Sequence, residues 1–306
     1  MPLKGANLVA LYPDYSMREV GDNDILYGAV WRDAHGRYHS LDAGEWNVDS
    51  PNRESVLRIM RELGYSRSPE GYECHLQFYK EPGLCFELHN SLFEKDLPMW
   101  RYYQNPWLRA RALSEGSDPS LCHAFLFPPE DEYVYCLAHT FKHSLLGGYG
   151  LRALADIIVM NRAFGNVLDR EYIREQLLEL GILDFAESLE RLGRAVYDGS
   201  PLTEDQEVAV LRMMECDTYG SKTEGLRIRM HRAAEEGRHP RLVELRRFFS
   251  FDTVRDDERF AAFERHRWLR PLFPLARVFD FARRALSDPR GQLSKIAALL
   301  GGARGR

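Results

Sequence analysis

The sequence predicts an α+β protein in which a small mixed sheet with flanking helices is followed by a mostly helical domain. Two observations support this prediction. Apolar runs with strand-like alternation occur in the first third of the 306-residue chain, and from about residue 105 onward apolar residues recur at helical spacing. A chain of this length also exceeds the usual size of a single core, so we expect two domains, residues 1–104 and residues 105–306.

The first third is expected to contain a strand, a helix and a hairpin. The apolar run DNDILYGAV, residues 22–30, predicts one buried strand. Residues 50–64 begin with Ser-Pro-Asn and end at a glycine, which is typical of a helix. Residues 72–93 alternate on both sides of a Glu-Pro-Gly turn, which predicts a hairpin. Its second arm has two faces, with Leu84, Phe86 and Leu88 on one and Cys85, Glu87 and His89 on the other.

The rest of the chain predicts a series of amphipathic helices. The first, residues 127–148, has prolines and acids at its start and two glycines at its end. From about residue 221 arginines are interleaved with acids, which indicates a solvated helical surface. The C-terminal segment 272–286 is expected to pack its apolar face onto the helical domain, although docking to a membrane surface or a partner is conceivable. Further helices are predicted at residues 151–165, 169–181, 184–199 and 203–217.

Composition narrows the classes of function. Hydrophobic residues make up 44% and charged residues 28%, which is ordinary for a folded protein. A net charge of −5 gives no global attraction to nucleic acid or anionic lipid, so DNA binding is not expected. No segment approaches the roughly 20 apolar residues that cross a bilayer, and a cytoplasmic protein is expected. The five cysteines lack the paired spacing of a zinc or redox motif and are interpreted as small apolar fillers.

Two aspartates, Asp22 and Asp24, stand one residue apart where the predicted strand begins. Residues two apart on a strand project to the same face, so these carboxylates repel each other unless a cation lies between them. Together with Glu87 on the hairpin, they form the kind of set that holds Mg²⁺ for phosphoryl or nucleotidyl transfer. A calcium loop does not fit, because Leu26 stands where that loop needs an oxygen ligand. The pair is also short enough to arise by chance in a chain with 46 acids.

Candidates for binding phosphate lie near the N-terminus. In the stretch LKGA, Lys4 and Gly5 form a turn in which the glycine could let backbone amides approach a phosphate. The helix-like segment after it would favour an anion at its N-terminus. Arg18 could either hold Asp22 in position or bind phosphate.

A second set of candidates lies in the stretch HTFKH. His139 and His143 are one helical turn apart, and Lys142 precedes the second. Lys142 could steady a triphosphate, and either histidine could bind phosphate or carry a proton. Alternatively, the histidines bond carbonyl groups or Asp156 between packed helices. Asp156 itself is expected to form an intrahelical ion pair with Arg152.

Several segments resemble a known family when they are taken in order. LKGANLVALYPDYSMREVGDNDIL, ELGY, CFELHNSL and YCLAHTFKHSLLGGYGLRALADI resemble successive motifs of an uncharacterised bacterial nucleotidyltransferase family of the DNA polymerase β-like superfamily. The helical tail from FFSFDTV to FARRAL resembles the C-terminal region of that family. The resemblance implies a nucleotidyltransferase-type sheet, a helical domain behind it, and transfer of a nucleoside monophosphate from an NTP such as ATP to an acceptor.

On that resemblance Asp22 and Asp24 bind two Mg²⁺ or Mn²⁺ ions, Glu87 is the third carboxylate, and Gly5 belongs to the phosphate-binding turn. Two departures point to an alternative. Family members usually have Gly followed by Ser or Gly where this chain has Gly5-Ala6, and relatives carry a strand before the LKG stretch. The alternative is a catalytically inactive relative that binds a nucleotide or a protein. The acceptor is open among a small molecule, a peptide, a protein and RNA.

Overall fold

The structure is a computed structural model that describes residues 1–40, 51–68, 74–113, 124–216, 220–254 and 258–287. The chain forms two compact units. One comprises Met1–Phe141 with Arg152–Leu202, and the other comprises Lys142–Leu151 with Thr203–Arg306. The domain boundary expected after residue 104 falls inside the first of these units.

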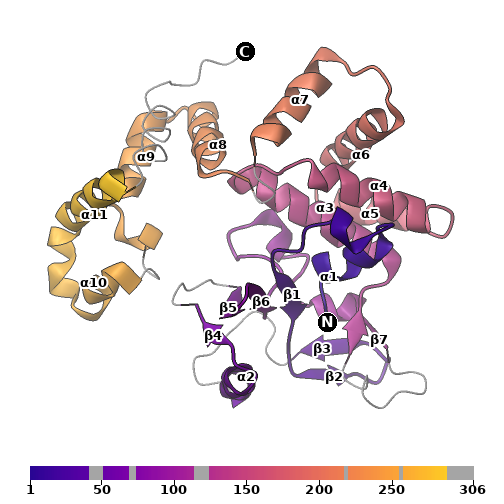
Figure 1. Ribbon diagram of the computed structural model, residues 1–306, viewed down its shortest axis with the longest axis horizontal. Helices are drawn as coiled ribbons and strands as arrows, with labels where there is room; N and C mark the ends of the chain where they lie inside the picture. The colour runs from indigo at the N-terminus through magenta and orange to yellow at the C-terminus, as the bar shows by residue number, and fades with distance from the viewer. Residues whose placement is uncertain (41–50, 69–73, 114–123, 217–219, 255–257, 288–306) are drawn as a thin grey trace. The chain divides into compact units, whose positions relative to one another are not determined.

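A four-stranded mixed sheet forms the centre of the first unit, in the spatial order β1-β6-β5-β4 (Figure 1). β1 runs parallel to β6, whereas β5 is antiparallel to both β6 and β4. The predicted mixed sheet and the predicted hairpin, formed by β5 and β6, are therefore confirmed. The strands are β1 (Asn23–Leu26), β4 (Ser66–Arg67), β5 (His75–Lys80) and β6 (Leu84–His89).

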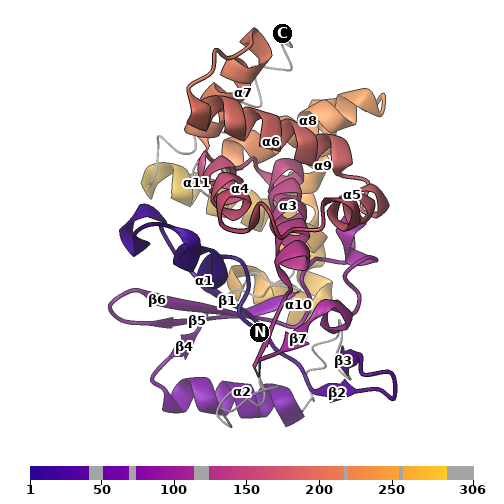
Figure 2. The same cartoon turned by 90° about the vertical axis from the view of Figure 1, so that its right-hand side faces the viewer.

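The two faces of this sheet differ in chemistry. Helix α2 (Pro51–Glu62) covers one face (Figure 2), and its Val56 and Met60 pack against apolar residues of the strands. The helix predicted here is confirmed, and it stops at Gly64, whose φ of 83° is the left-handed conformation that ends many helices. The opposite face looks toward α1 (Gly5–Leu8) and α3 (Pro129–Leu146) (Figure 2). It carries the polar side chains of Asp24, Gln77 and Glu87.

The strand predicted over residues 22–30 is shorter than expected. β1 ends at Leu26, and the chain bends before β2, which pairs with β3 in a separate two-stranded sheet. A Cβ at Gly28 would lie 2.6 Å from Ser40 Oγ and 3.3 Å from Trp107 Nε1, so a larger residue there would require these side chains to move. The apolar run therefore contributes residues to two sheets, through β1 and through the start of β2. The remaining short strands are β2 (Val30–Arg32), β3 (Tyr38–Ser40), β7 (Arg111–Ala112) and β8 (Phe125–Leu126).

The helices predicted for the second half of the chain are confirmed. α3 ends just before the two glycines at 147 and 148, and α7 begins with a capping box formed by Thr203 and Gln206. Those of the first unit are α4 (Arg152–Phe164), α5 (Arg170–Glu179) and α6 (Leu183–Asp198). Those of the second unit are α7 (Glu204–Glu215), α8 (Lys222–Glu235), α9 (Pro240–Phe249), α10 (Ala261–Arg265) and α11 (Phe273–Ser287).

The apolar face predicted for the C-terminal helix α11 is exposed instead of packed. The exposed fractions of Leu275, Phe279 and Leu286 are 70%, 75% and 85%. The helix is anchored at its start, where buried Phe273 contacts the rings of Phe251 and Phe260. The expected packing is therefore wrong for this face, because α11 packs through other side chains: Phe273 at its start, and Phe281, whose ring centroid lies 5.9 Å from that of Phe248 on α9. Among the described residues, no helix is long and apolar enough to cross a membrane.

Candidate functional site

Asp24 and Glu87 lie side by side on the polar face of the sheet. The parallel pairing of β1 with β6 sets Asp24 opposite Glu87, and the hairpin sets Gln77 opposite Glu87 on the other side. One oxygen of each carboxylate and a ring nitrogen of His89 all lie within 4.8 Å of one another. The structure thus brings together two of the three carboxylates that the sequence singled out.

Both oxygens of Asp24 have cationic partners. Lys4 Nζ lies 2.6 Å from Oδ2, and His89 Nε2 lies 2.8 Å from Oδ1. Burial alone would raise the pKa of Asp24, but the charge of Lys4 and the hydrogen bond from His89 lower it overall. Burial opposes the charged form of His89 too, yet its hydrogen bond to Asp24 raises its pKa well above the usual value. The charge of Asp24 is thus balanced by side chains of the protein itself.

Lys4 reaches Asp24 from the turn that precedes α1. Its φ of 22° is uncommon for a residue other than glycine, and its carbonyl oxygen accepts hydrogen bonds from the amides of Asn7 and Leu8. Burial would lower the pKa of Lys4, but neighbouring carboxylates, Asp24 first among them, raise it overall. The helix after this turn has only the four residues Gly5–Leu8 before a 3-10 segment, so it is shorter than the sequence indicated.

Glu132 of α3 lies buried beneath this turn. Its side chain accepts a hydrogen bond from Asn7 Nδ2 at 3.3 Å and another from the Lys4 amide. Asn7 also donates to the carbonyl oxygen of Pro2 at 3.1 Å. Burial raises the pKa of Glu132 to about 7, although these hydrogen bonds oppose the shift. A carboxyl group that titrates near neutral pH therefore supports the backbone that carries Lys4.

Replacing Glu132 is expected to change how folding depends on pH. The folded-state pKa of about 7 exceeds the ordinary value of 4.5, so the folded protein holds this proton more tightly than the unfolded chain does. Stability from this group is fully present below pH 4.5 and is lost as the pH rises to 7, by up to about 3 kcal/mol. The Glu132→Gln variant, which stays neutral, should show a flatter profile. Urea unfolding of both proteins from pH 5 to pH 8 measures the difference, and parallel profiles would contradict it.

Asp22 lies just before β1. Among the described residues, the group of close ligand atoms consists of Asp24, Glu87 and His89 and does not include Asp22. Burial and the charge of Asp24 raise the pKa of Asp22, while Lys4 and Arg152 act in the opposite direction. Asp22 therefore shares the electrostatic environment of the cluster. Its role as a metal ligand stays a prediction.

Arg18 is bound to Asp156 through two nitrogens. Its Nε and Nη2 lie 2.8 Å and 3.0 Å from the two oxygens of that carboxylate, and Tyr12 donates to it at 2.6 Å. The Arg18 side chain is only 3% exposed. The structure thus places Arg18 in a buried link between the N-terminal segment and α4, and gives Asp156 a partner other than the Arg152 that the sequence suggested. Arg152 donates to the carbonyl oxygen of Glu19 at 3.2 Å.

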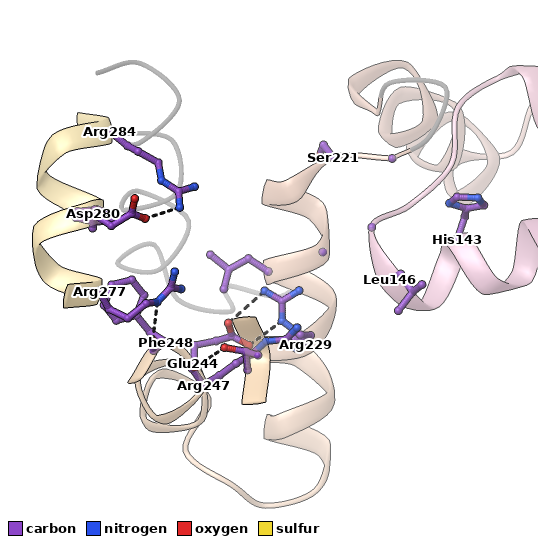
Figure 3. Close-up of a pocket in the computed structure, with 16 residues that line it drawn as sticks. His143, Leu146, Ser221, Arg229, Glu244, Arg247, Phe248, Arg277, Asp280 and Arg284 are labelled. Atoms are coloured by element: carbon purple, nitrogen blue, oxygen red, sulfur yellow. Dashed lines mark hydrogen bonds and ion pairs between the residues drawn. The ribbon is translucent and has the colours of Figure 1, made fainter. Parts of the chain in front are cut away.

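The residues of the HTFKH stretch divide between the two units. His139 belongs to the first, where its ring centroid lies 6.1 Å from that of Tyr135. Lys142 and His143 belong to the second, where His143 lines a cavity of about 740 Å³ (Figure 3). Their predicted contact with a nucleotide stays a prediction.

The cavity of the second unit has a mixed-charge lining. Arg229 binds Glu244 through two nitrogens at 2.9 Å and 3.2 Å, and Arg284 pairs with Asp280 (Figure 3). The arginines and acids are interleaved as the sequence indicated, but Glu244 and Asp280 are only 8% and 12% exposed, so these pairs are not part of the solvated surface that was expected. The lining also includes Arg247 and Arg277.

Three polar residues around Glu87 had no role assigned from the sequence. Gln77 Nε2 donates to Glu87 Oε1 at 2.9 Å, and His75 Nε2 lies 3.5 Å from Glu87 Oε2. His89 lies on the same face, and strand alternation alone placed it beside Glu87. Finding Gln77 and His75 would have required the register of the hairpin, which fixes the residue opposite each position.

The sequence of the chain has one informative match. Residues 47–198, about half of the chain, match a protein family described as an uncharacterised nucleotidyltransferase. Over these residues, the chain belongs to that family. The matched part of the nucleotidyltransferase includes Glu87 and His89 and begins after Asp24, and it supports nucleotidyl transfer as the general activity. No curated protein and no solved structure is significantly similar to the chain.

Proposed function

We propose that this nucleotidyltransferase moves a nucleoside monophosphate from an NTP to an acceptor, with pyrophosphate as the second product, at the Asp24 and Glu87 cluster. One observation carries the proposal: these two carboxylates are paired on adjacent parallel strands, and a lysine lies 2.6 Å from one of them. A cluster of this kind combines ligands for a divalent cation with a positive group for phosphates.

The carboxylates fit a magnesium ion. Magnesium in proteins takes one or two carboxylates and completes its shell with water and phosphate oxygens, and one oxygen each from Asp24 and Glu87 lies within 4.8 Å of the other. An ion bound to Oδ2 of Asp24 would replace the contact that Lys4 makes with this oxygen. When bound, Mg²⁺ would stabilise the charge of the phosphates during an in-line displacement. Mn²⁺ suits the same oxygens, and Asp22 would take part in binding a second ion.

The residues around the carboxylates would position them and bind the triphosphate. His89 orients Asp24, while Gln77 orients Glu87. Burial works against ionised Glu87, but a hydrogen bond from His89 and the charge of His75 lower its pKa overall, which favours a ligand over a proton acceptor. Lys4, whose side chain is 15% exposed, would exchange Asp24 for phosphate oxygens when the NTP binds.

Pyrophosphate release from each NTP, with and without Mg²⁺, tests this proposal. Mass spectrometry of candidate acceptors and of the protein itself should reveal an adduct of the mass of a nucleoside monophosphate. We expect activity to require the metal ion and to fall about 10²–10³-fold in Glu87→Gln. The matched control is Glu62→Gln, which removes an acid that is 61% exposed on α2. Full activity in Glu87→Gln would contradict the assignment.

A binding module without turnover is the second candidate. It is favoured by the two cationic partners of Asp24, because they neutralise this carboxylate without a metal ion. In that case calorimetry would show NTP binding of the same strength with and without Mg²⁺, and no pyrophosphate would form. Metal-dependent binding would reject this candidate.

A further inference from the structure

Cys74, His75 and His89 form a second group of ligand atoms beside the carboxylates. One atom from each of these side chains lies within 4.8 Å of the other two. Cys74 is 2% exposed, and the side chains of His75 and His89 are 11% and 8% exposed. Thiolate and imidazole are the ligands that Zn²⁺ prefers, whereas Mg²⁺ prefers oxygen. The two groups therefore suit different metals.

Each histidine directs Nε2 toward a carboxylate. His89 Nε2 lies 2.8 Å from Asp24 Oδ1, and His75 Nε2 lies 3.5 Å from Glu87 Oε2. The Nδ1 atoms of the two rings are the ones assigned to the contact with Cys74. His75 Nδ1 lies 3.5 Å from Cys74 Sγ, and the thiol is close enough to affect the pKa of His89. Zinc-bound histidines commonly donate their second ring N–H to a carboxylate. His89 already has this arrangement with Asp24, and Nε2 of His75 faces Glu87 at a longer distance.

A buried nitrogen marks the place for an ion. Nδ1 of His89 is buried without a hydrogen-bond partner among the described residues. Such an atom is costly to bury unless a donor, an acceptor or a metal ion satisfies it. Cys74 lies just before β5 and outside the strand. The rule that neighbouring strand residues point to opposite faces therefore does not apply to Cys74 and His75.

The distances agree with tetrahedral zinc. Bonds of about 2.3 Å to sulfur and about 2.0–2.1 Å to nitrogen place two tetrahedral ligand atoms roughly 3.5 Å apart. The distance from Cys74 Sγ to His75 Nδ1 is 3.5 Å. Glu94 Oε1 lies 3.6 Å from the same sulfur, and the second oxygen of this carboxylate is buried without a hydrogen-bond partner in the described part of the chain. Glu94 is therefore a candidate for the fourth ligand.

We propose that Cys74, His75 and His89 bind one Zn²⁺ ion through Sγ and the two Nδ1 atoms, with Glu94 or water in the fourth position. The ion replaces the thiol proton and any proton on Nδ1, which pass to solvent, and no oxidation state changes. Each imidazole is then a neutral donor whose Nε2–H faces Asp24 or Glu87. Zinc would thus fix the orientation of both carboxylates of the proposed magnesium site, while zinc binding itself does not depend on transfer activity.

Cobalt titration of the full-length protein after chelator treatment tests this site. We expect one equivalent of Co²⁺ to produce a thiolate-to-cobalt charge-transfer band, and one equivalent of Zn²⁺ to remove it even in excess Mg²⁺. Cys74→Ser should abolish the band and weaken Zn²⁺ binding by at least about tenfold. The control Cys85→Ser removes a buried thiol of β6 outside the group and should keep both. No band in the wild type, or an unchanged band in Cys74→Ser, would overturn the proposal.

A second variant keeps the test decisive if Cys74→Ser does not fold. His75→Gln retains the thiol, so it should keep a charge-transfer band and lose at least about tenfold in zinc affinity. Unchanged affinity in this variant would overturn the proposed ligand set, and Glu94→Gln decides between carboxylate and water in the fourth position. All of these measurements are made without an NTP. A negative pyrophosphate assay therefore counts against the proposed transfer reaction and not against the zinc site.

Discussion

The Asp24→Asn variant is expected to lose at least about 10³-fold in transfer rate, which corresponds to about 4 kcal/mol of transition-state stabilisation. Asparagine keeps the shape of the side chain and removes the charge that would bind the metal ion and face Lys4. Pyrophosphate release at saturating NTP and Mg²⁺ measures the loss. The control Asp96→Asn removes an exposed acid from the same unit and should retain the wild-type rate. An Asp24→Asn variant with more than a tenth of that rate would contradict the assignment.

The same substitution is expected to destabilise the fold. Asp24 is 3% exposed and has a cation at each oxygen, so its loss leaves buried His89 and partly buried Lys4 beside a neutral amide. Removing one partner of a buried ion pair costs about 3–5 kcal/mol. Urea unfolding measures this cost. The double variant Lys4→Met/Asp24→Asn should recover part of the stability and none of the activity, because the methionine removes one unpaired charge without restoring the carboxylate.

Much of the fold could be predicted because its signals are local. The helix α2 is defined by a proline at its start and Gly64 after its end, and the β5–β6 hairpin by alternation around a Glu-Pro-Gly turn. In each case the residues that determine the element lie within about twenty positions of one another. The strand predicted over residues 22–30 was too long, because the apolar run continues into Val30, which belongs to β2 and a separate sheet.

The candidate site could be predicted only in part, because most of its contacts join distant segments. Asp24 and Glu87 share one sheet face by strand alternation, but their alignment depends on a parallel pairing of residues that are 63 positions apart. Lys4 meets Asp24 only because a tight turn with positive φ redirects its side chain. The position of His75 near Glu87 depends on the register of the hairpin, which the sequence of β5 alone does not determine. The candidate metal-binding and phosphate-binding residues could thus be identified in the sequence, whereas the residues that they contact could not.

Arg18 is the second residue for which a large effect is expected, and the effect falls on stability. Its guanidinium is 3% exposed and binds both oxygens of Asp156, which lies 138 residues later. Arg18→Gln leaves that carboxylate beside a neutral amide, with the hydroxyl of Tyr12 still donating to it, so we expect a loss of about 3–5 kcal/mol in the free energy of unfolding. Urea denaturation measures this loss.

The affinity of Arg18→Gln for an NTP distinguishes two roles for Arg18, because loss of a phosphate ligand weakens nucleotide binding whereas loss of a structural link weakens the fold. A phosphate ligand would raise the dissociation constant for an NTP by at least about tenfold, since a charge-assisted hydrogen bond contributes about 1.5–3 kcal/mol. A structural link would leave that constant within about twofold, measured by calorimetry well below the unfolding transition. The double variant Arg18→Met/Asp156→Leu should then be more stable than Arg18→Gln, because it removes both charges from the buried site. An NTP affinity that falls in Arg18→Gln and stays low in the double variant would instead return Arg18 to the nucleotide site.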